Sequence, residues 1–128
     1  GERLVAAIDR LAPAGAGVVL GGDFNTKEAL GSLEAPEEPL FAVLRDAGFD
    51  WHRCNVPGPT QRTRPDGTPV PPFAKLDWLF TRHADAEAPA TIAAVDETGA
   101  AISDHDVVAA TVLTGVVAEQ KVAAGAEA

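Results

Sequence analysis

The sequence has very little cysteine: Cys54 is the only one among 128 residues. A single thiol excludes an internal disulfide and any zinc site built from several cysteines. No apolar run approaches the roughly 20 residues needed to span a bilayer, so no transmembrane helix is expected in this chain. Basic residues are also few, 10 against 19 acidic ones, and the net charge is −9. This balance argues against a chain whose whole surface binds nucleic acid, because such domains are usually basic.

Apolar residues make up 46% of the chain and charged residues 23%, over a length of 128 residues. These values are typical of one modest globular domain. Over residues 3–11 the apolar side chains repeat at helical spacing, which predicts an amphipathic helix, and the Pro- and Gly-containing segment 13–17 ends it. Residues 18–20 form an uninterrupted apolar run. This run predicts a strand buried on both faces, and helix followed by buried strand indicates an α/β layered domain.

The remainder predicts a second helix, a long loop and three more strands. Helical spacing of apolar residues predicts a helix over 40–47, and Gly48 is suited to the position just after its end. Residues 54–72 are rich in Pro, Gly and Thr and predict a long loop, which in a compact domain is usually functional or disordered. The expected strands are Lys75–Thr81, Thr91–Val95 and Val107–Leu113. The last is nearly all apolar and is expected at the centre of its sheet. The domain is expected to span residues 1–114, with 115–128 forming a flexible alanine-rich tail.

Positive charge gathers in one region of this acidic chain. Between positions 51 and 82 there are five basic residues and two acidic ones. The basic residues are Arg53, Arg62, Arg64, Lys75 and Arg82. A basic loop on an acidic body suits a ligand that carries a phosphate group. The alternative is that the arginines only keep a mobile loop soluble.

The first polar cluster follows the predicted strand at 18–20. Two glycines allow a sharp turn, and Asp23 and Asn25 come next at alternate positions. In extended backbone, residues i and i+2 share a face, so the carboxylate and the carboxamide are expected to point the same way. Together they can hold a water or a phosphate oxygen. The alternative is an Asx turn, with Asn25 capping the following helix.

Two further clusters lie in the C-terminal half. Asp77 stands inside an otherwise apolar strand, where a buried carboxylate is costly unless it has a partner. His105, in Ser103-Asp-His-Asp106, is the candidate partner, since a carboxylate on one ring nitrogen leaves the other free for substrate. Asp104 offers the hard oxygen that Mg²⁺ or Mn²⁺ prefers. Alternatively, Ser103 and Asp104 only form a turn before the last strand.

In order and spacing the three clusters resemble the C-terminal half of the endonuclease/exonuclease/phosphatase superfamily, which includes DNase I-like nucleases and phosphoinositide phosphatases. The matching motifs are Gly22-Asp-Phe-Asn25, Lys75-Leu-Asp-Trp-Leu-Phe80 and Ser103-Asp-His105. The preceding helix and the loop rich in Thr, Arg and Pro also match. The resemblance extends over residues 3–113.

The resemblance implies a phosphoester hydrolase that uses Mg²⁺ or Mn²⁺ and in-line attack of water on phosphorus. Asp23 would orient or deprotonate the attacking water, and Asn25 would hold that water or a phosphate oxygen. His105 would contact the scissile phosphate and Asp77 would fix its orientation. Asp104 would lie at the metal, directly or through water.

Substrate contacts are expected within the loop, from Thr60 or Thr63 and from Arg62 or Arg64. Because this loop supplies nearly all the local positive charge, a small phosphodiester or phosphomonoester is favoured over nucleic acid. The alternative, from a different functional class, is a non-catalytic module of the same fold that binds a phosphorylated ligand or a protein.

The resemblance also implies a fold, half of a DNase I-like four-layer α/β sandwich with a mostly antiparallel sheet and flanking helices. The N-terminal half of such a domain carries the principal metal ligand, a glutamate, and this chain shows no such segment. We therefore expect a C-terminal fragment, or one chain of a split protein, that requires the N-terminal half as its partner and is inactive alone. The compartment stays open, with a soluble, cytoplasmic protein favoured.

Overall fold

Helices and strands alternate in the first part of the chain, and strands alone follow. The structure is a computed structural model that describes residues 1–26, 33, 38–70 and 74–113. The elements are, in order, α1 (Glu2–Leu11), β1 (Val18–Asp23), α2 (Pro39–Asp46), β2 (Asp77–Arg82), β3 (Asp85–Ile92) and β4 (Val107–Leu113). The α/β class with antiparallel pairing is confirmed, whereas the four-layer sandwich and the half-domain status stay predictions.

The local signals for α2 give the expected helix, and its end is fixed by a Schellman motif. The amide of Gly48 donates to the carbonyl of Arg45, and the amide of Phe49 donates to that of Leu44, both at 2.9 Å. Gly48 has φ +93, which glycine adopts without steric cost. The chain therefore reverses directly after α2 and brings Phe49 back onto the helix.

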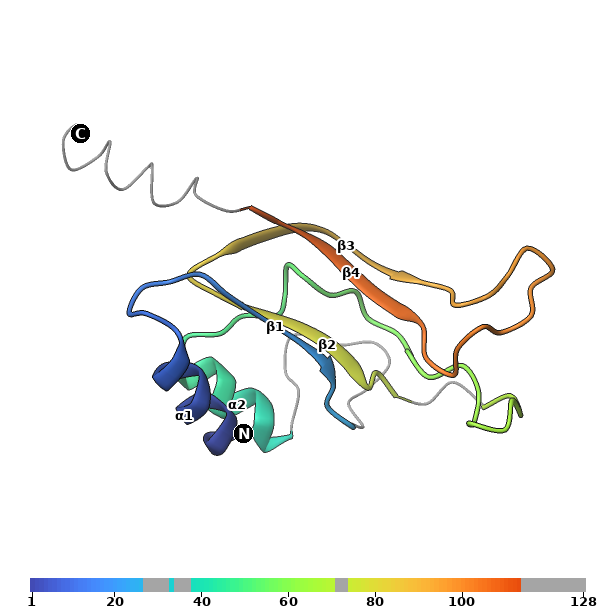
Figure 1. Ribbon diagram of the computed structural model, residues 1–128, viewed down its shortest axis with the longest axis horizontal. Coiled ribbons are helices and arrows are strands. Elements are labelled where there is room, and N and C mark those ends of the chain that lie inside the picture. The colour runs from blue at the N-terminus through green and yellow to red at the C-terminus, as the bar shows by residue number, and fades with distance from the viewer. Residues whose placement is uncertain (27–32, 34–37, 71–73, 114–128) are drawn as a thin grey trace.

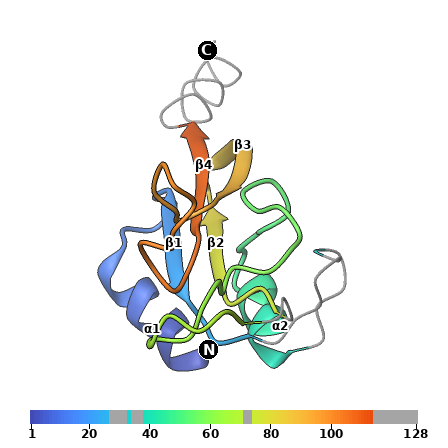
Figure 2. The same cartoon turned by 90° about the vertical axis from the view of Figure 1, so that its right-hand side faces the viewer.

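Strands β1 and β2 are far apart in the sequence but pair antiparallel. Their register runs from Val18 opposite Arg82 to Asp23 opposite Asp77. Helices α1 and α2 lie on the same side of this pair (Figures 1 and 2). The register therefore places the carboxyl end of β1 beside the start of β2.

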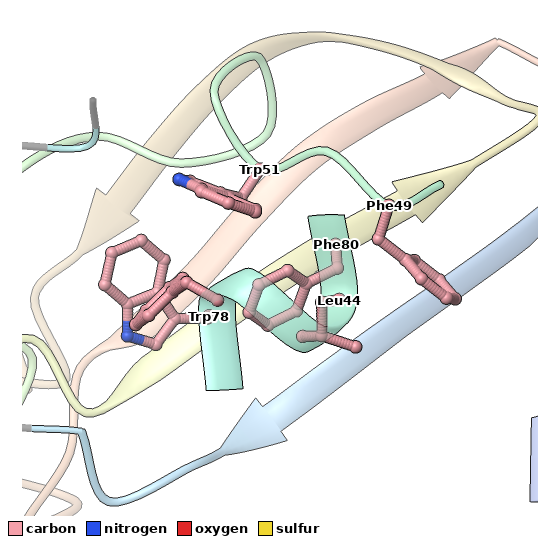
Figure 3. Close-up of a cluster of buried hydrophobic side chains, with 6 residues drawn as sticks. Leu44, Phe49, Trp51, Trp78 and Phe80 are labelled. Carbon is pink, nitrogen blue, oxygen red and sulfur yellow. The ribbon is translucent and has the colours of Figure 1, made fainter. Parts of the chain in front are cut away.

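The core fills the space between the helices and the pair β1–β2. Its buried members are Phe41, Leu44, Phe49, Trp51, Trp78 and Phe80. Figure 3 shows Trp78 and Phe80 projecting from β2 toward α2, with Trp51 and Phe49 closing the sides. Trp78 is 0% exposed and its ring meets that of Phe41 edge-on at 4.8 Å. The aromatic rings are the main contribution to burial in this core.

The expectation that residues 18–20 are buried on both faces is wrong. Val18 and Leu20 pack against the core, but Val19 is 52% exposed. The reason is that α1 and α2 cover only one face of β1. Alternate residues of a strand point to opposite faces, so Val19 lies on the uncovered side.

The strand expected at Thr91–Val95 is displaced. The structure instead has β3 at Asp85–Ile92, paired antiparallel with β4, and Val95 forms only an isolated bridge to Ala101. The register shifts between Glu87 and Ala90, where Pro89 stands. Proline cannot donate to a ladder and occurs in sheets at such β-bulges. The prediction failed because this strand is formed by backbone pairing with β4 rather than by an apolar pattern of its own.

Strand β4 has the predicted bounds, but its expected central position is wrong for the described part of the chain. There it pairs with β3 alone, and none of its residues is fully buried. The edge of β2 that does not pair with β1 is occupied by other segments of the chain. The side chain of Asn55 accepts from the amide of Leu79 and donates to its carbonyl, and Asp50 pairs with Thr81 through the backbone. Because these backbone groups are satisfied, β4 has nothing to pair with along this edge.

The remaining expectations concern the loop, the tail and membranes. Within the predicted loop, the described residues 54–70 form no helix and no strand, as expected. The predicted tail at 115–128 lies outside the described residues. Among the described residues, no helix has the length and apolarity needed to cross a membrane.

Candidate active site

Two acidic side chains and one imidazole meet where β1 ends and β2 begins. Asp23 is the last residue of β1 and Asp77 is the first of β2, and the two are paired in the register. Both lie on the sheet face opposite the helices, because they alternate with the core-facing residues. His105 arrives from the segment before β4, and its Nδ1 is 2.7 Å from Oδ2 of Asp77. The contact expected between Asp77 and His105 is therefore present.

The second ring nitrogen of His105 faces Asp23. Nε2 lies 4.0 Å from Oδ2 of Asp23, and the side chains of His105, Asp77 and Asp23 are 24%, 14% and 42% exposed. The carboxylate of Asp77 holds the imidazole from inside, while Nε2 remains accessible beside a more exposed carboxylate. One nitrogen is thus fixed and the other is available to a ligand.

Charge around His105 favours its protonated form. Burial lowers the pKa of His105, but the hydrogen bond and charge of Asp77, with the charges of Asp104 and Asp23, raise it by more. The net result is a pKa above the ordinary 6.5. The imidazolium can donate from Nε2 to an anionic oxygen.

Asn25 does not share an extended face with Asp23, contrary to the first expectation. Its φ is 54, and its amide donates to Oδ1 of Asp23 at 2.8 Å. This is the Asx turn of the alternative interpretation, and the helix cap that this interpretation also gave to Asn25 falls on residues outside the described ones. Asparagine tolerates left-handed backbone. The turn occupies Oδ1 of Asp23 and leaves Oδ2 facing His105.

Asp23, Asp77 and His105 can hold a metal ion. One ligand atom from each lies within 4.8 Å of the others. Two carboxylates and an imidazole are ligand types that divalent cations bind in proteins, and the imidazole is a ligand only in its neutral form. Asp104 is outside the group of described residues that meets this distance. Its carboxylate acts on His105 through charge, and its backbone carbonyl accepts from Arg62 and Thr63.

The residues expected to contact substrate differ in accessibility. Thr60 is 0% exposed and Thr63 is 7% exposed, so both side chains are buried. Arg62 forms a paired contact with Asp106, from Nε at 2.8 Å and from the terminal nitrogen at 3.2 Å. Arg64 is exposed and lines a hollow of about 350 Å³ together with Ser103 and Asp104. Of the predicted contacts, Arg64 has the most accessible charge.

The roles of two residues near the site were not predicted from the sequence. Asp106 ends the third cluster, yet no role was predicted for it because its partner Arg62 is 44 positions away. Lys75 was assigned to a strand, to the basic region and to the second motif, but no role was predicted for its side chain. In the structure it is 1% exposed, and its Nζ has no hydrogen-bond partner among the described residues. The only signal in the sequence was a lysine directly before an apolar run.

Lys75 leads to a stability prediction. Burial lowers the pKa of Lys75 to about 8, despite the opposing charge of Asp77. The unfolded chain then binds more protons than the folded one between pH about 8 and 10.5, so stability rises with pH through this window. Lys75→Met should raise the free energy of unfolding at pH 7 by up to about 3 kcal/mol. Urea unfolding at pH 7 and pH 10 measures this gain, which should shrink at the higher pH.

The matched control is Arg45→Met, which removes an exposed cation from α2. It should change stability by less than about 0.5 kcal/mol at either pH. A Lys75→Met variant less stable than the wild type at pH 7 would show that the ammonium group has a favourable partner.

The fold and site together define a class: an α/β protein with a carboxylate–histidine cluster suited to a divalent cation and an anionic ligand. The sequence profile of the Endonuclease/Exonuclease/phosphatase family matches residues 1–105. The chain belongs to this family, whose members hydrolyse phosphoester bonds, typically with a divalent metal. The matched region ends at His105 and includes all three motifs. No curated protein and no solved structure matches the chain.

Proposed function

We propose that this chain forms part of a phosphoester hydrolase that attacks phosphorus with water and depends on Mg²⁺ or Mn²⁺. The observation that carries this is the Asp77–His105 pair, held at 2.7 Å with Nε2 facing Asp23. Family membership supports the reaction class. An oriented imidazole beside an exposed carboxylate suits the stabilisation of a phosphate and the positioning of water.

The side chains have separate roles in this proposal. Nε2 of His105 donates to a phosphate oxygen and stabilises the charge that develops there, while Asp77 keeps the ring oriented. Oδ2 of Asp23 accepts a proton from the attacking water, since Oδ1 is engaged by the Asx turn. Asn25, which is exposed beside this turn, holds the water or a phosphate oxygen.

A divalent cation fits beside these groups. We propose that Asp104 lies at the cation, directly or through water, because Asp77 is engaged by His105 and the free oxygen of Asp23 serves as the proton acceptor. When bound, the cation neutralises charge on the phosphate. From the family resemblance we infer that the other ligands of the cation come from an N-terminal half, which is not among these 128 residues. That partner would also cover the sheet face on which Val19 is exposed.

The distribution of ion pairs favours a small phosphoester as substrate. Of the five basic residues between positions 51 and 82, three pair with Asp106, Asp85 and Asp9, and Lys75 is buried. Arg64 is the one whose charge is exposed and has no ion pair among the described residues. A single accessible cation suits one phosphate group, whereas a nucleic-acid backbone requires several.

The test is a hydrolysis assay on the intact natural protein with bis(4-nitrophenyl) phosphate and 4-nitrophenyl phosphate. Removal of metal by a chelator should abolish turnover, and Mg²⁺ or Mn²⁺ should restore it. Raising salt from 50 to 200 mM should lower kcat/KM by only about threefold, as for about one phosphate contact. Saturable binding of a phosphorylated ligand without turnover would support the non-catalytic module instead.

A further inference from the structure

The segment 60–63 connects the two parts of the chain that carry Asp77 and His105. On one side, the hydroxyl oxygen of Thr60 accepts the amide of Leu76 at 2.9 Å and the amide of Asp77 at 3.1 Å. Thr60 is 0% exposed, so this oxygen is shielded from solvent. A hydroxyl oxygen can accept two hydrogen bonds, and here both come from backbone amides at the start of β2.

On the other side, the same segment binds the residues next to His105. The amide of Asp106 donates to the carbonyl of Thr60 at 2.7 Å, and the amide of Arg62 donates to the carbonyl of Asp104 at 2.7 Å. The guanidinium of Arg62 then holds the carboxylate of Asp106 with two hydrogen bonds. His105 lies between two residues whose backbones are fixed by this segment.

We propose that Thr60 and Arg62 are positioning residues that hold Asp77 and His105 at hydrogen-bond distance, and that neither contacts the substrate. The inference rests on the proposed function, since the pair they position is the one proposed to act on the phosphoester. Thr60 is fully buried, and the charge of Arg62 is paired with that of Asp106. Their hydrogen bonds instead join segments that are 16 and 44 positions distant in the sequence.

The proposal predicts different results for two replacements of Thr60. Thr60→Val keeps the shape but has no acceptor, so the amides of Leu76 and Asp77 lose their buried partner. Thr60→Ser keeps the acceptor. In Thr60→Val we expect kcat of the intact protein to fall about tenfold with KM within twofold, since small displacements of reacting groups are costly. In Thr60→Ser we expect near wild-type kcat.

A second readout is independent of activity. In ¹⁵N NMR spectra of the intact protein, the Nδ1–H signal of His105 reports its hydrogen bond to Asp77. We expect this signal to shift or broaden in Thr60→Val and in Arg62→Lys, because lysine cannot form the two-pronged contact with Asp106. It should be unchanged in Thr60→Ser. Arg53→Lys, which alters an exposed pair with Asp85, is the matched control and should change neither readout.

The outcomes separate the two proposals. A raised KM with unchanged kcat and an unchanged His105 signal in Thr60→Val and Arg62→Lys would make these residues substrate contacts and overturn the inference. A shifted His105 signal in those variants, together with no hydrolysis by the wild-type protein, would uphold the positioning role and refute the proposed function. If Thr60→Val does not fold, Arg62→Lys against Arg53→Lys provides the same comparison.

Discussion

Replacing His105 by alanine in the intact protein should lower kcat by about 10²-fold or more, and Asp23→Ala should have an effect of similar size. His105→Ala removes the only described imidazole that lies between two carboxylates, at 2.7 Å from Asp77 and 4.0 Å from Asp23. Asp23→Ala removes the exposed carboxylate on the free side of that ring. Initial rates at saturating substrate and metal measure both effects.

The chain offers a matched control for this experiment. His52 also has its Nδ1 at 2.7 Å from a carboxylate, that of Asp50, but this pair is exposed and lacks a second carboxylate in the described residues. His52→Ala should retain kcat within about twofold, since it changes a surface group away from the cluster. Full activity in both His105→Ala and Asp23→Ala would refute the assignment of the active site.

Trp78→Ala should lower the free energy of unfolding by about 3–5 kcal/mol. The side chain is 0% exposed, and its ring packs against those of Phe41 and Phe80 in the aromatic core of Figure 3. Its Nε1 also donates to the hydroxyl of Thr26 at 2.7 Å and to the carbonyl of Lys75 at 3.0 Å. The change therefore leaves a cavity and removes two hydrogen bonds, although the Thr26 hydroxyl still donates to the carbonyl of Lys75. Urea unfolding followed by circular dichroism measures the loss.

Two further variants separate the contributions. Trp78→Phe keeps much of the apolar volume and removes the hydrogen bonds, so its loss should be smaller, about 1–3 kcal/mol. Ile92→Ala, at a position that is 52% exposed on β3, should cost less than about 1 kcal/mol. An effect of Trp78→Ala no larger than that of Ile92→Ala would contradict a contribution of the buried Trp78 side chain to stability.

How far the sequence predicts the elements depends on how local their signals are. The helices α1 and α2 and the strand β4 were expected close to their observed bounds, because periodicity and the glycine after α2 act within a few residues. Strand β3 was misplaced because its segment becomes a strand only by pairing with β4. The exposure of Val19 was missed because it depends on which face the helices cover.

The site divides in the same way. Apolar surroundings alone required a partner for Asp77, and the motifs supplied His105 as the candidate. The Asx turn at Asp23 was available as an alternative from the residue types. The neutralisation of Arg62 and the burial of Thr60 were not foreseeable, because each depends on a contact with a residue distant in the sequence.

By itself the sequence determined the α/β class, the motifs and the kinds of side chain available for chemistry, since these follow from composition and short-range spacing. The tertiary structure decided which of these side chains meet. The register of β1 with β2 places Asp23 beside Asp77, and segment 60–63 brings the chain around His105 to them. Such contacts depend on pairing between distant segments, and short-range patterns in a sequence carry no record of that pairing.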